Sequence, residues 1–522
     1  KPEFIREQIE KEYPILPTLI GNSLIEANSL TDNVFENRKF DCIVTNPPWS
    51  SVQDIDDPES QKERQAIGKK GKIGTITEYK NVSDYERSQA FLLRVKKWSN
   101  LNTVFSLIVK NSIFLNDNAN TFREDLLNIY QLNYFYELSN YNKILFKKRI
   151  IGKINSANIE LGSTEPCAIL VFEQSKQKSN TVKYISPKLN DFSEKFECIH
   201  FTQKDINEVK QSNFADDLLW RVLVNGDFED YNLIKEKLTI ENRINIECRS
   251  GFQPKKGMKP LGKPIYKDLI TPKDFKRYVM TNQVSKFNWS QKLHRDRDYR
   301  IFLGCRIIAP VRPLKNDNYK IKGIRINNDN FVHRDDILCF RPNLENLSYE
   351  NYKVILGIFN SKLIGYTLFH ISSQWGKEGD MKRPKLRNID IEKYLKLPQI
   401  NFNESKVKKI NQNVEEIENL KKQNKSTEEN ENLIDELVFE LYNLLTYEKE
   451  IIKEFYKVRT ERTGKSKYVT ESDLNEYILN FTDIFSLMLA ENYTLKAIYK
   501  ISANVGAIVC FTIVDEKEIV EP

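Results

Sequence analysis

Hydrophobic and polar positions follow two different patterns along the 522 residues of this chain. Up to about residue 175, short apolar runs typical of buried strands alternate with segments of helical periodicity. This alternation predicts an α/β fold, with a doubly wound, Rossmann-like sheet over residues 1–175 and a mixed connector over residues 176–243. One of the runs, Phe40 to Thr45, has the continuous apolar character of a buried parallel strand.

The remaining segments have shorter elements. Residues 244–400 combine short strand-like runs with many basic residues, which predicts a separate α+β domain. Residues 401–446 carry apolar positions at helical spacing on both sides of a polar stretch. Too few heptads persist for a long coiled coil, so a helical hairpin is predicted there. Residues 447–522 are expected to form a small α+β domain, with one helix before two strands.

Composition narrows the function classes. The formal net charge of +7 is a mild basic excess, which is compatible with nucleic-acid binding. Seven cysteines without CxxC spacing and only four histidines argue against a metal site and favour a reduced, cytoplasmic protein. The chain contains neither an apolar run of 18 residues nor a signal peptide, so no membrane partner is expected.

The segment Asn46-Pro47-Pro48-Trp49 directly follows the Phe40–Thr45 run. Such a segment forms a rigid loop at the carboxyl edge of an α/β sheet, where these folds bind ligands. An asparagine amide, an outward backbone carbonyl and an aromatic face are the groups needed to hold an exocyclic amino group beside a stacked base. The simpler alternative is a plain turn, because Asn-Pro and Pro-Pro both mark loops.

This segment resembles catalytic motif IV of the amino-group DNA methyltransferases in the adenine-N6 (gamma) arrangement, with Trp49 in place of the usual Tyr or Phe. Residues 88–93, 105–112 and 122–127 are similar to the elements that follow in that family. Residues 143–148, together with the later strand 168–172, resemble motif VIII, whose aromatic packs on the flipped base and here is Phe146. Residues 20–24 resemble the motif near the cofactor's adenine, with Asn22 at the position of the usual acidic residue.

The resemblance implies that a methyl group passes from S-adenosyl-L-methionine to N6 of an adenine in double-stranded DNA. Asn46, Pro47, Pro48 and Trp49 are then the catalytic candidates, because two oxygen acceptors would hold the amino hydrogens and catalysis would rest on placement and electrostatics. Extruding the base costs a few kcal/mol. Stacking on Trp49 and Phe146, expected on the two sides of the base, returns roughly 1–3 kcal/mol.

The glycine-rich cofactor loop precedes the Asn-Pro-Pro motif in the gamma arrangement. Only 45 residues lie ahead of Asn46, and they contain no Gly-x-Gly. Because one βαβ unit takes about 30 residues or more, the opening strands of the domain do not fit. The chain is therefore expected to be the carboxyl-terminal part of a longer enzyme. Alternatively, a second polypeptide completes the cofactor site.

Residues 244–400 resemble the DNA target-recognition domain of the TaqI-like type IIG restriction–modification enzymes, in which a helix precedes a basic strand and loop facing DNA. Basic residues interleaved with aromatics fit phosphate contacts and base-edge reading, although ordinary solvated charge explains any single lysine. The DNA-binding candidates are Lys255, Lys256, Arg306, Arg312, Lys377, Lys382, Arg383, Lys385 and Arg387.

Three functions remain open. The favoured one is a site-specific adenine-N6 DNA methyltransferase of a bacterial restriction–modification or phage-defence system. The second is a type IIG enzyme whose nuclease lies in a preceding segment. No convincing Pro-Asp…Asp/Glu-x-Lys arrangement is found here, so this chain gives that alternative no support. The third is a non-catalytic DNA-recognition subunit, which the intact Asn46 disfavours. The recognised DNA sequence and the oligomeric state do not follow from the sequence.

Overall fold

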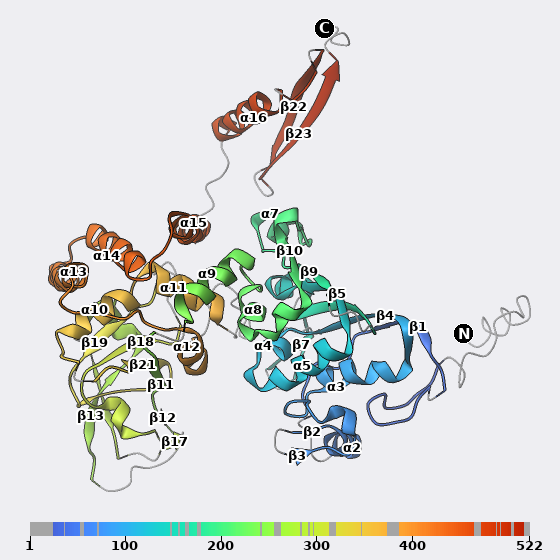
Figure 1. The fold of residues 1–522 in the computed structure, drawn as a ribbon, viewed down its shortest axis with the longest axis horizontal. Helices are drawn as coiled ribbons and strands as arrows, with labels where there is room; N and C mark the ends of the chain where they lie inside the picture. Colours follow the sequence, from blue (N-terminus) through green and yellow to red (C-terminus); the bar gives the residue numbers. More distant parts are fainter. Residues whose placement is uncertain are drawn as a thin grey trace, which may run out of the picture.

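The computed structural model describes residues 24–515, apart from residues 36, 53–56, 70–71, 147–148, 155–156, 162–165, 175–178, 241–242, 255–262, 282–283, 291–292, 296, 313–319, 346, 373–385, 464–470, 487, 491 and 503–505. Figure 1 shows two lobes side by side and a C-terminal unit that projects from them. The sheet lobe comprises residues 24–240, the second lobe residues 243–463 and the C-terminal unit residues 471–515.

The sheet lobe is built on a six-stranded sheet in the order β1-β4-β8-β5-β9-β10. Its strands are β1 (Phe40–Thr45), β4 (Ser99–Lys110), β5 (Gln131–Glu137), β8 (Cys167–Glu173), β9 (Thr181–Ile185) and β10 (Ile206–Lys210). The β1–β4 and β5–β9 pairs are parallel and the other pairs are antiparallel, so the sheet is mixed rather than doubly wound as predicted. The connection from β5 to β8 returns to the edge where β5 ends, and β8 must therefore run back antiparallel.

Two further predictions about this sheet differ from the structure. The sheet extends through β9 and β10, within the segment assigned to a connector. The strand β1 was expected to be buried, but it lies at the edge of the described sheet, and the Val44 side chain is 73% exposed. A run of apolar residues identifies a strand but does not reveal whether both of its edges are paired.

Helices cover the sheet and connect its strands (Figure 1). Phe105, Leu107 and Val109 alternate with less buried positions along β4, and the helices α3 and α5 pack on β4 and β5. The helices are α2 (Pro58–Ile67), α3 (Arg87–Arg94), α4 (Ser112–Leu115), α5 (Asn120–Ile129), α6 (Asn142–Leu145), α7 (Asp191–Phe196), α8 (Asp217–Val222) and α9 (Phe228–Leu238). Short hairpins are formed by β2 (Gly68–Lys69) with β3 (Lys72–Ile73) and by β6 (Arg149–Ile154) with β7 (Ala157–Leu161).

The second lobe contains small sheets covered by helices. Its four-stranded antiparallel sheet has the order β11-β21-β18-β19, and a three-stranded sheet has the order β16-β13-β20. The strands are β11 (Ile246–Ser250), β12 (Gln253–Pro254), β13 (Tyr266–Ile270), β14 (Phe275–Lys276), β15 (Val279–Met280), β16 (Ser285–Asn288), β17 (Leu293–Arg295), β18 (Arg306–Pro310), β19 (Ile324–Ile326), β20 (Phe331–His333) and β21 (Ile337–Pro342). This combination agrees with the predicted α+β character of the segment.

The helices of the second lobe are α10 (Asn351–Phe359), α11 (Lys362–Ile371), α12 (Asn388–Tyr394), α13 (Ser405–Lys422), α14 (Glu428–Leu441) and α15 (Thr446–Thr463). The pair α13 and α14 is the predicted hairpin, and it packs on α10. Gly357 permits this close approach, because a Cβ atom there would lie 2.8 Å from Cγ2 of Ile410. Within the described residues no single helix is long and apolar enough to cross a membrane, and α10 and α11 pass that test only together, bent by 55°.

The C-terminal unit consists of α16 (Glu471–Ser486) and an antiparallel hairpin of β22 (Tyr493–Ser502) and β23 (Gly506–Asp515). One helix before two strands is the order that the sequence predicted. The predicted domain of residues 447–522 also included most of α15, however, and that helix packs on α11 of the second lobe instead.

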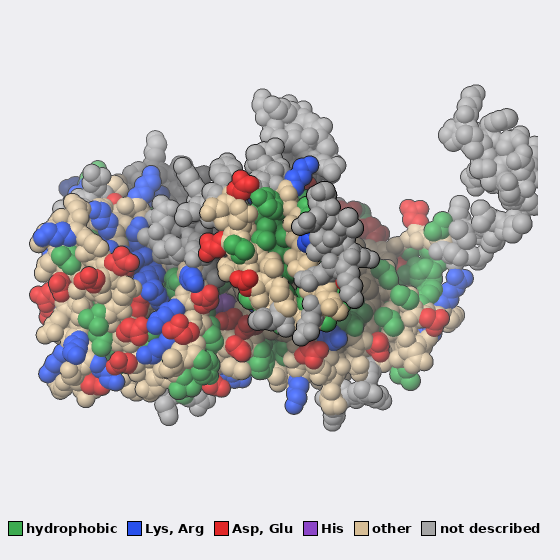
Figure 2. All heavy atoms as spheres, turned by 90° about the horizontal axis from the view of Figure 1, so that it is seen from above, with side chains coloured by type: hydrophobic (Ala, Val, Ile, Leu, Met, Phe, Trp, Pro, Cys, Tyr) green, Lys and Arg blue, Asp and Glu red, His purple; other side chains and the backbone are tan. Residues whose placement is uncertain are grey.

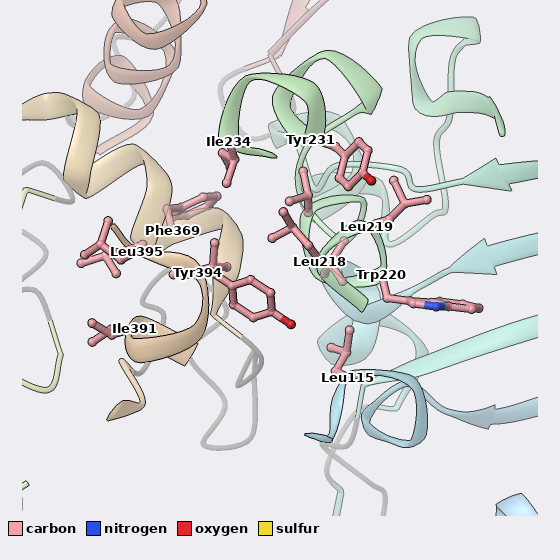
Figure 3. Close-up of a cluster of buried hydrophobic side chains, with 14 of the residues drawn as sticks. Leu115, Leu218, Leu219, Trp220, Tyr231, Ile234, Phe369, Ile391, Tyr394 and Leu395 are labelled. Carbon is pink, nitrogen blue, oxygen red and sulfur yellow. The ribbon is translucent and has the colours of Figure 1, made fainter. Parts of the chain in front are cut away.

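The two lobes share one cluster of buried hydrophobic residues. In Figure 3, Leu218 of α8 faces Phe369 of α11 and Tyr394 of α12. Beside these side chains, the buried Arg221 guanidinium donates to Asp117 Oδ1 at 2.7 Å and to Asp390 Oδ1 at 2.8 Å. Because Asp117 belongs to the sheet lobe and Asp390 to α12, Arg221 joins the two lobes through an ion pair on each side.

Candidate active site

The Asn46–Trp49 segment leaves the carboxyl end of β1 next to the carboxyl end of its parallel neighbour β4. Two hydrogen bonds anchor it there. The Trp49 indole Nε1 donates to the Ile108 carbonyl of β4 at 3.3 Å, and the Ser88 hydroxyl of α3 donates to the Pro48 carbonyl at 3.1 Å. The segment is therefore held by both the strand and the helix that flank it.

The two predicted acceptors lie between the end of β1 and these anchors. Asn46 is exposed, and Pro47 is buried. No hydrogen bond from the described part of the chain reaches the Asn46 side chain or the Pro47 carbonyl. The Pro48 carbonyl, in contrast, already accepts one hydrogen bond, from Ser88.

An ion pair and a hydrogen bond on Glu86 lie close to the loop after Trp49, and the sequence pattern did not single out these residues. Lys110, the last residue of β4, forms an ion pair with Glu86 at 2.6 Å. The Ser51 hydroxyl also donates to Glu86, at 3.2 Å, and Ser51 and Glu86 pair as an isolated β-bridge. Glu86 directly precedes α3, so this cluster connects the loop after Trp49 to the ends of β4 and α3.

The structure brings Trp49 and Phe146 together although they are far apart in sequence. Their ring centroids are 5.2 Å apart and their planes are nearly perpendicular, at 87°. A base stacked between two parallel rings needs roughly 7 Å between them, twice the usual carbon–carbon contact distance. In this conformation the rings touch edge to face, and a base could enter between them only after they separate.

A buried carboxylate, Glu137, lies at the carboxyl end of β5, which is the same edge of the sheet. Burial raises the pKa of the Glu137 carboxyl to about 7, although hydrogen bonds from Ser139 and Tyr184 oppose this rise. Nothing in the sequence pattern pointed to Glu137. The one available hint was an acidic residue at the end of an otherwise largely apolar and aromatic strand.

One DNA-binding prediction is wrong in physical terms. The Arg306 side chain is buried at the start of β18 and donates to the backbone carbonyls of Gly304 at 2.8 Å, Asn328 at 3.1 Å and Phe331 at 3.0 Å. Burial lowers the pKa of this guanidinium. Arg306 therefore holds loops of the second lobe together and cannot reach a DNA phosphate in this conformation.

Arg387 also has a partner within the protein. Its Nη2 atom lies 3.1 Å from Asp117 Oδ2 of the sheet lobe, next to the Arg221 ion pairs. The structure thus places Arg387 between the lobes rather than on an open surface. Arg312 is half-buried and stays a candidate. The remaining candidates lie outside the described residues: Asn22, Lys255, Lys256, Lys377, Lys382, Arg383 and Lys385.

A cavity of about 270 Å³ in the second lobe gathers charged side chains that the sequence did not single out. It is lined by Glu247, Arg249, Asp298, Arg300, Ile301, Cys339 and Arg341. Arg300 pairs with Asp298, and Arg249 pairs with Glu392, so these two cations are already neutralised. On the face of this lobe that Figure 2 shows, Lys and Arg side chains lie among Asp and Glu side chains.

The described residues do not by themselves provide a site for S-adenosyl-L-methionine. No glycine-rich loop lies beside Asn46 in this part of the chain. The described residues also contain no group of three or more His, Cys, Asp or Glu residues that could hold a metal ion. The outer edge of β1 is unpaired in the described sheet and carries the exposed Val44, which leaves room for further strands next to Asn46.

Comparisons with known proteins agree with part of this picture. No curated protein sequence gave a significant match. Among solved structures, the chain is similar to the type IIL restriction-modification enzyme MmeI in complex with DNA, with 12% identity and a TM-score of 0.47 over 87% of this chain and 63% of that one. It is also similar to the type IIG restriction endonuclease BpuSI, with 13% identity and a TM-score of 0.29 over 80% and 56% of the two chains.

The chain thus spans less than two thirds of the length of these two enzymes. Residues 4–145 match the model of one protein family, described as Eco57I restriction-modification methylase. The match runs through β1 and the Asn46–Trp49 segment to the end of α6, and it supports a DNA methyltransferase role for this part of the chain.

Proposed function

We propose that this chain is the base-binding and DNA-recognition part of a site-specific adenine-N6 DNA methyltransferase in a restriction–modification or phage-defence system. The observation that carries the proposal is the pair of unoccupied acceptors, the Asn46 amide oxygen and the Pro47 carbonyl, beside the Trp49 ring. A carbonyl pair in a rigid loop suits a primary amino group, which has two hydrogens to donate.

In the proposed reaction, the two acceptors bind the two hydrogens of the exocyclic nitrogen of adenine. The Pro48 carbonyl already accepts a hydrogen bond from Ser88, and the Pro47 carbonyl is proposed as the second acceptor. Holding both hydrogens out of the ring plane weakens the delocalisation of the nitrogen lone pair, which makes this nitrogen a better nucleophile. S-adenosyl-L-methionine supplies the methyl group when it is bound, and this chain contributes placement and electrostatics without a strong base.

The target adenine must leave the DNA duplex to reach this edge of the sheet, which costs a few kcal/mol. Trp49 and Phe146 are proposed to stack on the extruded base and to return roughly 1–3 kcal/mol of that cost. Their ring contact of 5.2 Å then represents the closed, base-free arrangement. In this view the base replaces the contact between the rings.

The second lobe is proposed to recognise the DNA sequence. Its shared core with the sheet lobe and the Arg221 ion pairs give it a defined orientation relative to Asn46. The cofactor is proposed to bind beside the open edge of β1, on residues that precede the described part or on a second polypeptide.

The proposal is tested by the product. The complete enzyme is incubated with labelled S-adenosyl-L-methionine and DNA, and the digested nucleosides are separated by mass spectrometry. We expect the label in N6-methyladenine. A label found in N4-methylcytosine or 5-methylcytosine, or a label absent from DNA, would contradict the proposal.

A further inference from the structure

The ends of three elements of the sheet lobe meet on the Glu137 carboxylate. Glu137 is the last residue of β5, and its side chain is 1% exposed. One oxygen, Oε1, accepts from the Ser139 amide at 3.0 Å and from the Ser139 hydroxyl. The other, Oε2, accepts from the Asn111 side-chain amide and from the Tyr184 hydroxyl of β9 at 3.3 Å.

These donors belong to segments that lead to both candidate stacking rings. Asn111 directly follows β4, whose Ile108 carbonyl accepts from the Trp49 indole. Ser139 begins the short 3₁₀ turn Ser139–Tyr141, which continues into α6. Phe146 caps α6, and its backbone N–H donates to the Asn142 carbonyl at 2.9 Å. The carboxylate is therefore bonded to the support of Trp49 on one side and to the start of the segment that carries Phe146 on the other.

We propose that Glu137 is a positioning residue that fixes the segment Ser139–Phe146 relative to β4 and so keeps Phe146 next to Trp49, on the side of the loop where an extruded base would stack. This inference rests on the proposed function.

The burial of this carboxylate supports a dedicated role. A buried charge is costly unless it is well hydrogen-bonded, and four donors converge on Glu137. The ionisable side chains facing it are Tyr184 of β9, Cys167 at the start of β8 and the cation Lys188 after β9. An apolar side chain at the end of β5 would avoid the cost of burying the charge, but it could not join the turn at Ser139 to Asn111.

Two substitutions separate the hydrogen-bonding role from simple filling of space. In Glu137→Gln, the amide oxygen can accept from Ser139, and the amide nitrogen can donate to the Tyr184 hydroxyl and to a turned Asn111 side chain. Glu137→Ala removes all four hydrogen bonds. We therefore expect glutamine to rescue what alanine loses.

The first readout is the fluorescence of 2-aminopurine placed at the target position of the DNA, which rises when the base leaves the stack. Glu137→Ala should reduce this rise and lower kcat/KM by roughly fivefold or more, as for the loss of one base-stacking contact. Glu137→Gln should stay within about twofold of wild type, a difference of only a few tenths of a kcal/mol. If Glu137→Ala does not fold, Ser139→Ala replaces it in the test. This milder change keeps the backbone donor, so it should lower the 2-aminopurine signal and kcat/KM by less than is expected for Glu137→Ala.

The second readout is a double mutant. If Glu137 acts through Phe146, Glu137→Ala combined with Phe146→Ala should be no worse than Phe146→Ala alone, because residues that act as a unit are not additive. The matched control is Glu448→Ala, which removes another buried glutamate, one that accepts from the Leu445 amide at 2.6 Å in the second lobe. It should leave the 2-aminopurine signal unchanged.

The outcomes distinguish this inference from the proposed function. Suppose that the wild-type enzyme methylates adenine and that folded Glu137→Ala gives an unchanged 2-aminopurine signal. This result would overturn the role of Glu137 and leave the proposed function standing. Additive losses in the double mutant would also overturn this role, because they would show an effect independent of Phe146. A wild-type enzyme that methylates no adenine would instead contradict the proposed function.

Discussion

Replacing Glu137 by glutamine should remove a pH-dependent penalty on the stability of the sheet lobe. An ordinary glutamate has a pKa of 4.5, and burial raises the pKa of Glu137 to about 7. Below pH 4.5 the folded and unfolded states both carry the proton, so the penalty is absent. Between pH 4.5 and 7 only the folded state keeps the proton, so the free energy of unfolding falls as the pH rises.

The size of the effect follows from the same two values. At about 1.36 kcal/mol for each pKa unit, the difference between 4.5 and about 7 corresponds to a full penalty of about 3 kcal/mol above pH 7. Because the transition is gradual, about 2–3 kcal/mol of this penalty develops between pH 5 and 8. Glutamine has no ionisable proton. The free energy of unfolding of Glu137→Gln should therefore increase relative to that of wild type by this amount between pH 5 and 8.

Urea unfolding of both proteins at several pH values, followed by circular dichroism, measures this difference. Glu431→Gln is a matched control of opposite sign. Although burial opposes its charge, Arg277 and Lys320 lower the pKa of Glu431 to about 2, so its contribution is lost only below pH 4.5 and is nearly constant from pH 5 to 8. A Glu137→Gln difference that does not change with pH, or that falls as pH rises, would refute the reasoning.

Three further changes test other parts of the structure. Phe146→Ala should reduce the 2-aminopurine signal on DNA binding, and an unchanged signal would remove Phe146 from the base site. Arg221→Met leaves the Asp117 and Asp390 carboxylates at the lobe interface without this partner. It should therefore lower the free energy of unfolding by about 3 kcal/mol. A decrease below about 1 kcal/mol would contradict the role of Arg221 between the lobes. Gly357→Val should cost about 1–3 kcal/mol in urea unfolding, because its Cβ would crowd Ile410, and an unchanged midpoint would show that α13 can shift.

Local patterns predicted the elements of this protein well. The strand Phe40–Thr45, the hairpin of α13 and α14 and the final helix with two strands all follow from periodicity within a short window. The open edge of β1 and the antiparallel insertion of β8 did not follow, because both depend on which strands pair across long stretches of sequence. The exposed Val44 shows how an apolar residue can mark a strand without being buried in the described sheet.

The candidate site was predictable only in part. The Asn46–Trp49 segment could be proposed as a site because its chemistry is contiguous in sequence, and Phe146 could be proposed only through a resemblance. Arg306 was misjudged because its charge beside an apolar strand gives no indication of burial among backbone carbonyls. Glu137 was missed because its four donors come from separate parts of the fold.

The central claim is that the Asn46 amide oxygen and the Pro47 carbonyl hold the amino group of an extruded adenine. Its most direct test compares methyl transfer and DNA affinity for wild type and Asn46→Ala in the complete enzyme. We predict that Asn46→Ala abolishes transfer to adenine and leaves the dissociation constant for DNA nearly unchanged. Retained transfer, or an equal loss of transfer and DNA binding, would contradict the claim.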